Sequence, residues 1–234
     1  MKERKHTSTK PAPVNVLDGI SEFKAQLSDL EVQDIAEIFN ELDREEIMKL
    51  YRLLPKDMAA EVFAYVDSEQ QQFIVEALTD TEIGEIMGAL FVDDAVDFID
   101  EMPADVVKRV LQNVVPDKRQ IINQVLQYPD DSAGGIMTTE YVDLREDATV
   151  QEAFDDIRNT GIDRETIYTC YVIRQDRLLV GVVSAKAIML ANPQDRIGDI
   201  MDTNFIYAHT TDDQEAIAEK FRKYELLAMP VVDR

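Results

Sequence analysis

Apolar residues recur with a helical period through the first half of the chain. Across residues 17–128 they follow the three- and four-residue spacing of an amphipathic helix, and glycine is rare. After residue 128 the pattern changes to short β-rich segments that alternate with helical ones. The sequence therefore predicts an all-helical region followed by a mixed region that contains strands.

The helical region carries an internal repeat of twelve residues, with units that begin at residues 43, 55, 67, 79, 91 and 103. Asp43 and Thr79 are each followed three residues later by Glu, which is the spacing of a capping box. A helix of this length cannot bury its apolar stripe alone, so we expect successive helices to stack as an α-solenoid-like superhelix. The eighth and twelfth positions of every unit are apolar, namely Leu50, Val62, Ile74, Ile86, Phe98 and Val110, then Leu54, Val66, Leu78, Leu90, Met102 and Val114.

The mixed region begins with a run of turn-forming residues at 128–135 and then contains two related units. The first unit predicts strands over 141–145, 166–173 and 178–184, with helices over 149–160 and 185–190. The second unit begins after residue 195 and predicts a strand over 205–209, a helix over 212–224 and a strand over 229–233.

Composition excludes several classes of function. The 234 residues include 47 Asp and Glu against 24 Lys and Arg, and a net charge of −23 argues against a nucleic-acid partner. The longest uncharged stretch, residues 120–129, is too short for a membrane span, which needs about 20 apolar residues. One cysteine and two histidines form neither an internal disulfide nor a usual zinc site, so we expect any metal to be bound by oxygen.

The negative charge is concentrated between residues 57 and 105, which hold 14 carboxylates and no Lys, Arg or His. Glu61, Glu85 and Asp97 occupy the same position of their repeat units, and Asp93 and Asp97 lie one helical turn apart. Such a surface can be a solvated acidic face. Because like charges at this spacing repel, it can also be a surface that binds a hard divalent cation or a basic partner.

The segment YPDDSAGGIMTTEYVDLREDATVQEAF, residues 128–154, resembles the MgtE magnesium transport family. The IM dipeptides, the VVS strand and the MPVV strand resemble a pair of cystathionine-β-synthase (CBS) domains. The resemblance implies an α + α/β fold: a disordered tail at 1–16, an acidic helical N domain at 17–128, a first CBS domain at 129–195 and an incomplete second CBS domain at 196–234.

In that family the corresponding region senses Mg²⁺ on the cytoplasmic face of the membrane, and ions between the N domain and the CBS domains favour a compact, pore-closing state. The resemblance implies a hinge at residues 128–135, a homodimer through the CBS domains and a transmembrane pore domain of the same protein as partner. It assigns the metal ligands to Glu61, Asp93, Asp97, the backbone carbonyl of Gly135, and Glu225, where the family commonly has aspartate.

Other functions remain open or are excluded. CBS pairs often bind adenine nucleotides, but Thr169, Lys186 with Ala187, and Leu226 depart from the family's nucleotide pattern, so we do not expect ATP binding. His209 has no apparent catalytic partner in the sequence, and we expect no enzymatic activity. The alternative function is a protein-interaction scaffold, in which the helical repeat docks a basic partner and metal has no role.

Overall fold

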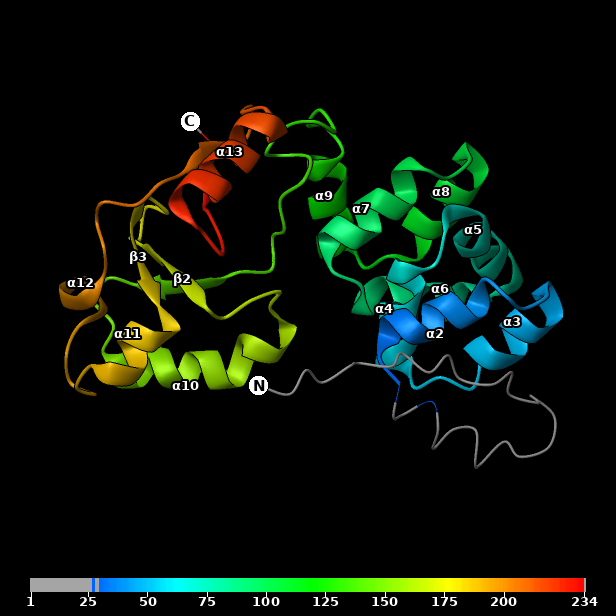
Figure 1. Ribbon diagram of the computed structural model, residues 1–234, viewed down its shortest axis with the longest axis horizontal. Helices are drawn as coiled ribbons and strands as arrows, with labels where there is room; N and C mark the ends of the chain where they lie inside the picture. Colours follow the sequence, from blue (N-terminus) through cyan, green and yellow to red (C-terminus); the bar gives the residue numbers. More distant parts are fainter. Residues whose placement is uncertain (1–26, 28–29, 234) are drawn as a thin grey trace, which may run out of the picture.

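The structure of the chain, a computed structural model, describes residue 27 and residues 30–233 (Figure 1). The tail predicted at 1–16 lies outside the described residues. A helical N domain occupies one side of the molecule (Figure 1). The part expected to hold the two CBS domains, called the CBS module below, occupies the other side and contains two small sheets. Within the described part of the chain, no helix combines the length and the apolar character that a membrane span requires.

The N domain is a succession of short helices that start at a constant interval. The helix N-caps recur every twelve residues from Glu31 to Val115, which confirms the predicted repeat and extends it by one unit in each direction. The helices are α2 (Val32–Phe39), α3 (Arg44–Tyr51), α4 (Lys56–Tyr65), α5 (Ser68–Ala77), α6 (Asp80–Ala89), α7 (Val92–Asp100), α8 (Ala104–Asn113) and α9 (Pro116–Val125).

Side-chain caps explain several of these starts. Asp43 and Thr79 form the predicted capping boxes with Glu46 and Glu82, and Asp67 accepts a hydrogen bond from the Gln70 amide. Phe91, the N-cap of α7, has no polar side chain that could cap its helix. The start of α7 therefore lacks a side-chain cap of its own, as do the starts of α2, α4, α8 and α9.

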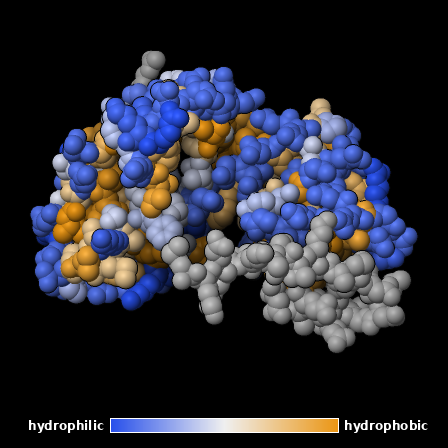
Figure 2. All heavy atoms as spheres, viewed as in Figure 1, coloured by the Kyte–Doolittle hydropathy of each residue, from blue (hydrophilic) through white to orange (hydrophobic). Residues whose placement is uncertain are grey.

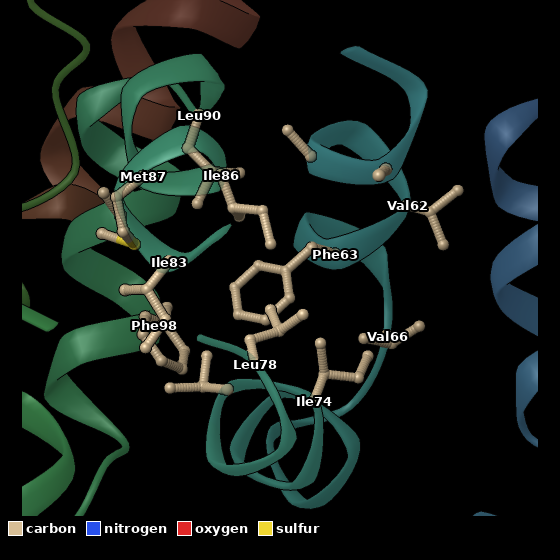
Figure 3. Close-up of a cluster of buried hydrophobic side chains, with 14 of the residues drawn as sticks. Val62, Phe63, Val66, Ile74, Leu78, Ile83, Ile86, Met87, Leu90 and Phe98 are labelled. Atoms are coloured by element: carbon tan, nitrogen blue, oxygen red, sulfur yellow. The ribbon is translucent and has the colours of Figure 1, made fainter. Parts of the chain in front are cut away.

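Alternate helices pack against one another: α2 on α4, α4 on α6 and α6 on α8, with α3 on α5 and α7 on α9. All twelve apolar positions predicted from the repeat are buried. Figure 3 shows the Phe63 ring of α4 among side chains from α5, α6 and α7. Its centroid lies 5.0 Å from that of Phe98 in an edge-to-face arrangement, so this pair anchors α7 to the body of the domain.

The first CBS unit is a three-stranded sheet in the order β1-β2-β3, in which β1 is parallel to β2 and β2 is antiparallel to β3. β2 begins three residues later than predicted, because the Thr166 hydroxyl accepts a hydrogen bond from the Tyr168 amide and forms a turn there. The elements are β1 (Val142–Arg145), α10 (Val150–Thr160), the 3-10 helix η1 (Gly161–Asp163), β2 (Thr169–Ile173), β3 (Leu179–Ser184) and α11 (Ala185–Leu190).

The second CBS unit is smaller. It contains α12 (Ile197–Ile200), β4 (Ala208–His209), α13 (Gln214–Tyr224) and β5 (Val231–Val232), and β4 runs parallel to β5. Both strands are shorter than predicted. Pro230 has no N–H to donate to a ladder, and the β4–β5 pairing begins at Val231.

The junction between the two parts is bonded to the second CBS unit. The amides of Ala133 and Gly134 donate to the carbonyls of Asp212 and Thr210, at 2.8 and 2.9 Å. Ala133 is buried with Ala208, Ile217 and Met229. The second half of the hinge predicted at 128–135 is therefore held against this unit.

Candidate metal site

The carboxylates of α7 lie on the side of the N domain that meets the CBS module. α7 and α9 are on that side in Figure 1. The Val92 amide at the start of α7 donates to Glu140 Oε1 at 3.1 Å, and the Glu165 amide donates to the Glu140 carbonyl oxygen at 2.9 Å. Two carboxylates that follow the N domain in sequence thus stand beside the acidic start of α7.

Burial and mutual repulsion raise the pKa values of these groups. Burial is the largest cause of the raised pKa of Asp93, and the nearby charges of Glu140 and Asp97 add to it. Burial, followed by the charges of Asp93 and Glu165, raises the pKa of Asp94 to about 6. The pKa of Glu165 is raised by burial and by Asp93 and Glu140. Negative charge is therefore held here at a cost in free energy.

The other end of α7 also meets an acidic neighbour. Burial raises the pKa of Asp100, and the charge of Asp130 in the junction raises it further. Burial raises the pKa of Asp97, with a smaller effect from Glu101. The acidic character therefore extends along the whole length of α7.

Lys118 of α9 offsets part of this charge. Its Nζ donates to the carbonyls of Gly88 and Leu90 at the end of α6. Burial lowers the pKa of Lys118, whereas the charges of Glu140, Asp93 and Asp94 act in the opposite direction. The ammonium group is thus held near the carboxylates by backbone hydrogen bonds.

One carboxylate oxygen of the acidic cluster, formed by Asp93 and Asp94 of α7 with Glu140 and Glu165, lacks a hydrogen-bond partner in the described part of the chain. Asp93 Oδ1 is buried and has no hydrogen-bond donor among the residues that the structure describes. A buried carboxylate oxygen without a donor costs free energy, and a hard cation such as Mg²⁺ takes oxygen ligands of this type. The carboxylate oxygens of Asp93 are therefore of the type that a divalent cation binds.

The five predicted ligands are not all brought together. Asp93 and Asp97 lie one turn apart on α7, and the exposed Glu61 is on α4, which packs against α7. Gly135 closes the turn of residues 132–135, and the exposed Glu225 is the C-cap of α13 in a left-handed conformation, with φ of 51°. Within residues 30–233, no group of three or more His, Cys, Asp or Glu side chains is arranged to hold a metal ion.

The sequence reasoning missed Glu140, Glu165 and Lys118. A signal existed for Glu140, because it is the one charged residue in the stretch 132–142. No comparable signal marks Glu165, which approaches α7 only through the tertiary fold.

Comparisons with known proteins agree with the two-part architecture. Residues 30–131 match the MgtE intracellular N domain, and residues 133–193 and 197–234 match the CBS domain. The magnesium transporter MgtE of Thermus thermophilus is 34% identical over 211 residues, which cover 88% of this chain and 47% of the relative. The magnesium transporter MgtE of Bacillus subtilis is 28% identical over 214 residues, which cover 92% of this chain and 48% of the relative. The chain spans about half the length of these curated relatives.

Two solved structures share the fold along most of both chains. The cytosolic domain of the Mg²⁺ channel MgtE in complex with ATP is 33% identical, with a TM-score of 0.85, and the match covers 90% of this chain and 86% of that one. The soluble part of a magnesium transporter is 28% identical, also with a TM-score of 0.85, and the match covers 92% of this chain and 84% of that one. The family is one of transporters and not of enzymes, as the sequence predicted. The chain belongs to the MgtE family of magnesium transporters and is similar to the cytosolic part of its members.

Proposed function

We propose that the chain is the Mg²⁺-sensing regulatory region of a magnesium transporter, on the cytoplasmic face of the membrane. The observation that carries the proposal is the set of half-buried carboxylates on α7 that face Glu140 and Glu165, with Asp93 Oδ1 lacking a donor among the described residues. A divalent cation relieves this repulsion and supplies the missing partner. The transmembrane pore domain of the same protein receives the resulting change.

The residues that hold the ions in this proposal are Asp93 and Asp97 of α7, Glu61 of α4, the Gly135 carbonyl and Glu225. Carboxylate and carbonyl oxygens are the ligands that Mg²⁺ takes in proteins. The first three lie on neighbouring helices of the N domain, whereas Gly135 and Glu225 belong to the junction and the second CBS unit. An ion shared between the two groups favours the arrangement in which the two parts are docked.

The response follows from differential affinity. Without metal, the carboxylates of α7 and of the CBS module repel one another, which favours separation. Ions bound between them favour the docked state. The size of this effect is the difference between the binding free energies of the ions for the docked and the separated states. Several coupled sites make the response to Mg²⁺ steeper than one site does.

We also propose a homodimer through the CBS module. Apolar side chains are exposed there: Ile162 of η1 is 89% exposed, and Met189 and Leu190 of α11 are 70% and 78% exposed. Figure 2 shows apolar surface in the region of α11. Sedimentation tests this part, because a chain that remains monomeric at about 10 µM or above contradicts it.

We propose no nucleotide role for this chain, although a relative was solved with ATP. Thr169 begins β2 and Lys186 lies on the exposed side of α11, in place of the aromatic and arginine residues of the family's nucleotide pattern. Addition of ATP is expected to leave the Mg²⁺ midpoint unchanged, and a shift of that midpoint overturns this part.

A Mg²⁺ titration followed by small-angle scattering tests the metal proposal. The parent chain is expected to become more compact as Mg²⁺ is added. The double variant D93N/D97N is expected to need a Mg²⁺ concentration at least about tenfold higher, because weakened metal sites typically lose affinity by about this factor. The control D67N/E69Q also removes two charges but leaves α7 unchanged, and should follow the parent. If D93N/D97N compacts at the parental Mg²⁺ concentration, the acidic face is only solvated and the scaffold function is favoured.

A further inference from the structure

The first turn of α7 takes its cap from the CBS side of the chain. Its N-cap residue is Phe91, which has no capping group, and the Val92 amide donates instead to Glu140 Oε1 at 3.1 Å. Glu140 follows Val92 by 48 residues and lies beyond the end of α9. A carboxylate at this position satisfies an amide that has no partner within the helix and also complements the helix dipole.

Contacts within the CBS side hold Glu140 in place. The hydroxyls of Thr138 and Thr139 lie 3.3 and 3.1 Å from Glu140 Oε2 and donate to it. The Glu140 carbonyl accepts from the Glu165 amide, and the neighbouring Tyr141 ring packs edge-to-face on Tyr171 of β2, with centroids 5.5 Å apart. The carboxylate is therefore oriented by the CBS module and moves with it.

Within the N domain, the same corner is held from its other side. Lys118 of α9 donates to the carbonyls of Gly88 and Leu90, where α6 ends. A cation thus caps the end of α6 from inside the domain, and an anion caps the start of α7 from outside it. Separation of the two parts removes only the second of these caps.

We propose that Glu140 is a positioning residue that couples docking of the CBS module to the placement of α7. The cap forms when the two parts are docked and is lost when they separate, so Glu140 holds the helix that carries Asp93 and Asp97 in its docked position. This inference rests on the proposed function, because Mg²⁺ acts on the same docking equilibrium. It adds a contact that is not itself a metal ligand.

Two substitutions separate the cap from the charge. E140Q removes the negative charge but keeps an oxygen that can accept from the Val92 amide, whereas E140A removes both. Because Glu140 adds to the repulsion within the acidic cluster, loss of its charge alone lowers the Mg²⁺ needed for docking. Loss of the cap acts in the opposite direction, and removal of a helix cap typically changes an equilibrium by about fivefold.

The experiment measures hydrogen exchange of the Val92 amide, together with the Mg²⁺ midpoint for protection from protease. We expect E140A to lose about fivefold in Val92 protection and to need more Mg²⁺ than the parent. E140Q should keep most of the protection, with a midpoint equal to or below the parental one. The control E146A removes an exposed glutamate of the same module and should leave the Val92 amide unchanged.

Equal protection of Val92 in E140A and the parent overturns the inference, as does a shift of both midpoints in the same direction. If the parent does not respond to Mg²⁺ at all, the proposed function fails. The hydrogen exchange of the Val92 amide then tests by itself whether Glu140 caps α7. Protection lost in E140A but kept in E140Q then supports the cap, and protection unchanged in E140A refutes it.

Discussion

The acidic run, residues 57–105, contains two groups of carboxylates that have different surroundings in the N domain. On α5 and α6, cations from outside the run form ion pairs: Glu69 with Arg44, Asp80 with Arg109, and Glu85 with Lys56, at 3.4, 2.9 and 2.6 Å. On α7, Asp93 and Asp94 face the carboxylates of Glu140 and Glu165. The same local composition therefore yields a partly neutralised surface on α5 and α6 and a repulsive one on α7.

The two groups of carboxylates differ in their exposure to solvent as well as in their charged neighbours. Exposed ion pairs such as those of α5 and α6 contribute between about 0 and 1 kcal/mol each, so they cancel charge more than they stabilise the fold. Asp93 and Asp94 of α7 are half-buried, whereas Asp97 and Asp100 are exposed, and burial is the main reason that the pKa values of Asp93 and Asp94 are raised. The need for a cation is therefore concentrated on α7, although the sequence spreads negative charge over the whole run.

Loss of the anchor of α7 has the largest expected effect. Phe63 is fully buried and packs edge-to-face on Phe98 of α7, so Phe63→Ala is expected to destabilise the N domain by about 3–5 kcal/mol in urea unfolding. The control is Phe73→Ala, since the half-buried Phe73 ring packs under the Arg44 guanidinium at 5.1 Å. Equal losses for the two variants would mean that the Phe63–Phe98 pair does not anchor α7.

Removal of the cation beside α7 comes next. Lys118→Met keeps the aliphatic stem but loses the hydrogen bonds to the end of α6 and a positive charge near Asp93 and Asp94. We expect a loss of about 1–2 kcal/mol in thermal unfolding without Mg²⁺, and a smaller loss with Mg²⁺. Lys108→Met, at an exposed lysine of α8, is the control. Equal stability of the two variants contradicts the view that α7 is under electrostatic stress.

The pH dependence of stability should report the same stress. The pKa of Asp94 is raised to about 6, mainly by burial, so the folded state binds this proton more tightly than the unfolded state. Its contribution to stability is present below pH about 4 and is lost as pH rises through about 6. After allowance for solvent screening we expect about 1 kcal/mol. The charged groups that face Asp94 are Asp93, Asp97, Glu140, Glu165 and Lys118.

Urea unfolding between pH 4 and 8 without metal measures this loss, with Asp94→Asn as the comparison. The stability of the parent relative to Asp94→Asn should fall as pH rises through that range, and Mg²⁺ should reduce the fall. A pH-independent difference would show that Asp94 carries no excess cost in the folded state.

The smallest effect is expected at Glu225, which lies in the second CBS unit and outside both groups of carboxylates. Glu225 caps α13 in a left-handed conformation, with φ of 51°, which glycine adopts without strain. Glu225→Gly should therefore stabilise the fold by up to about 1 kcal/mol and weaken the Mg²⁺ response. Arg177→Gly, at the other described non-glycine residue with positive φ, should give a similar gain without an effect on Mg²⁺. An unchanged Mg²⁺ response in Glu225→Gly excludes Glu225 as a ligand.

The N domain was predictable because its signals are local. Caps such as Asp43 and Thr79 act on amides two or three residues away, and the twelve-residue repeat fixes which positions are buried. The strand ends were less predictable. Residues 166–168 and 205–207 have the composition of strands, but a hydroxyl turn at Thr166 and the short pairing of β4 with β5 decide where the ladders begin.

The candidate site was predictable only in part. The i, i+4 spacing gives the proximity of Asp93 and Asp97, because a helix fixes it. The approach of Glu140 and Glu165 to α7 depends on how the chain after α9 returns to the N domain, and no local pattern encodes that path. The roles of Glu61, Gly135 and Glu225 as metal ligands stay predictions that rest on the family resemblance.

The most direct test of the account is the distance between the N domain and the CBS module as a function of Mg²⁺. Spin labels at Glu37→Cys on α2 and Asp143→Cys on β1, both exposed positions, report this distance once the buried Cys170 is replaced by Ala. The account predicts a broad distance distribution without Mg²⁺ that narrows to one docked population as Mg²⁺ is added, and a shift of that transition to higher Mg²⁺ in D93N/D97N. A distribution that is the same at every Mg²⁺ concentration would contradict it.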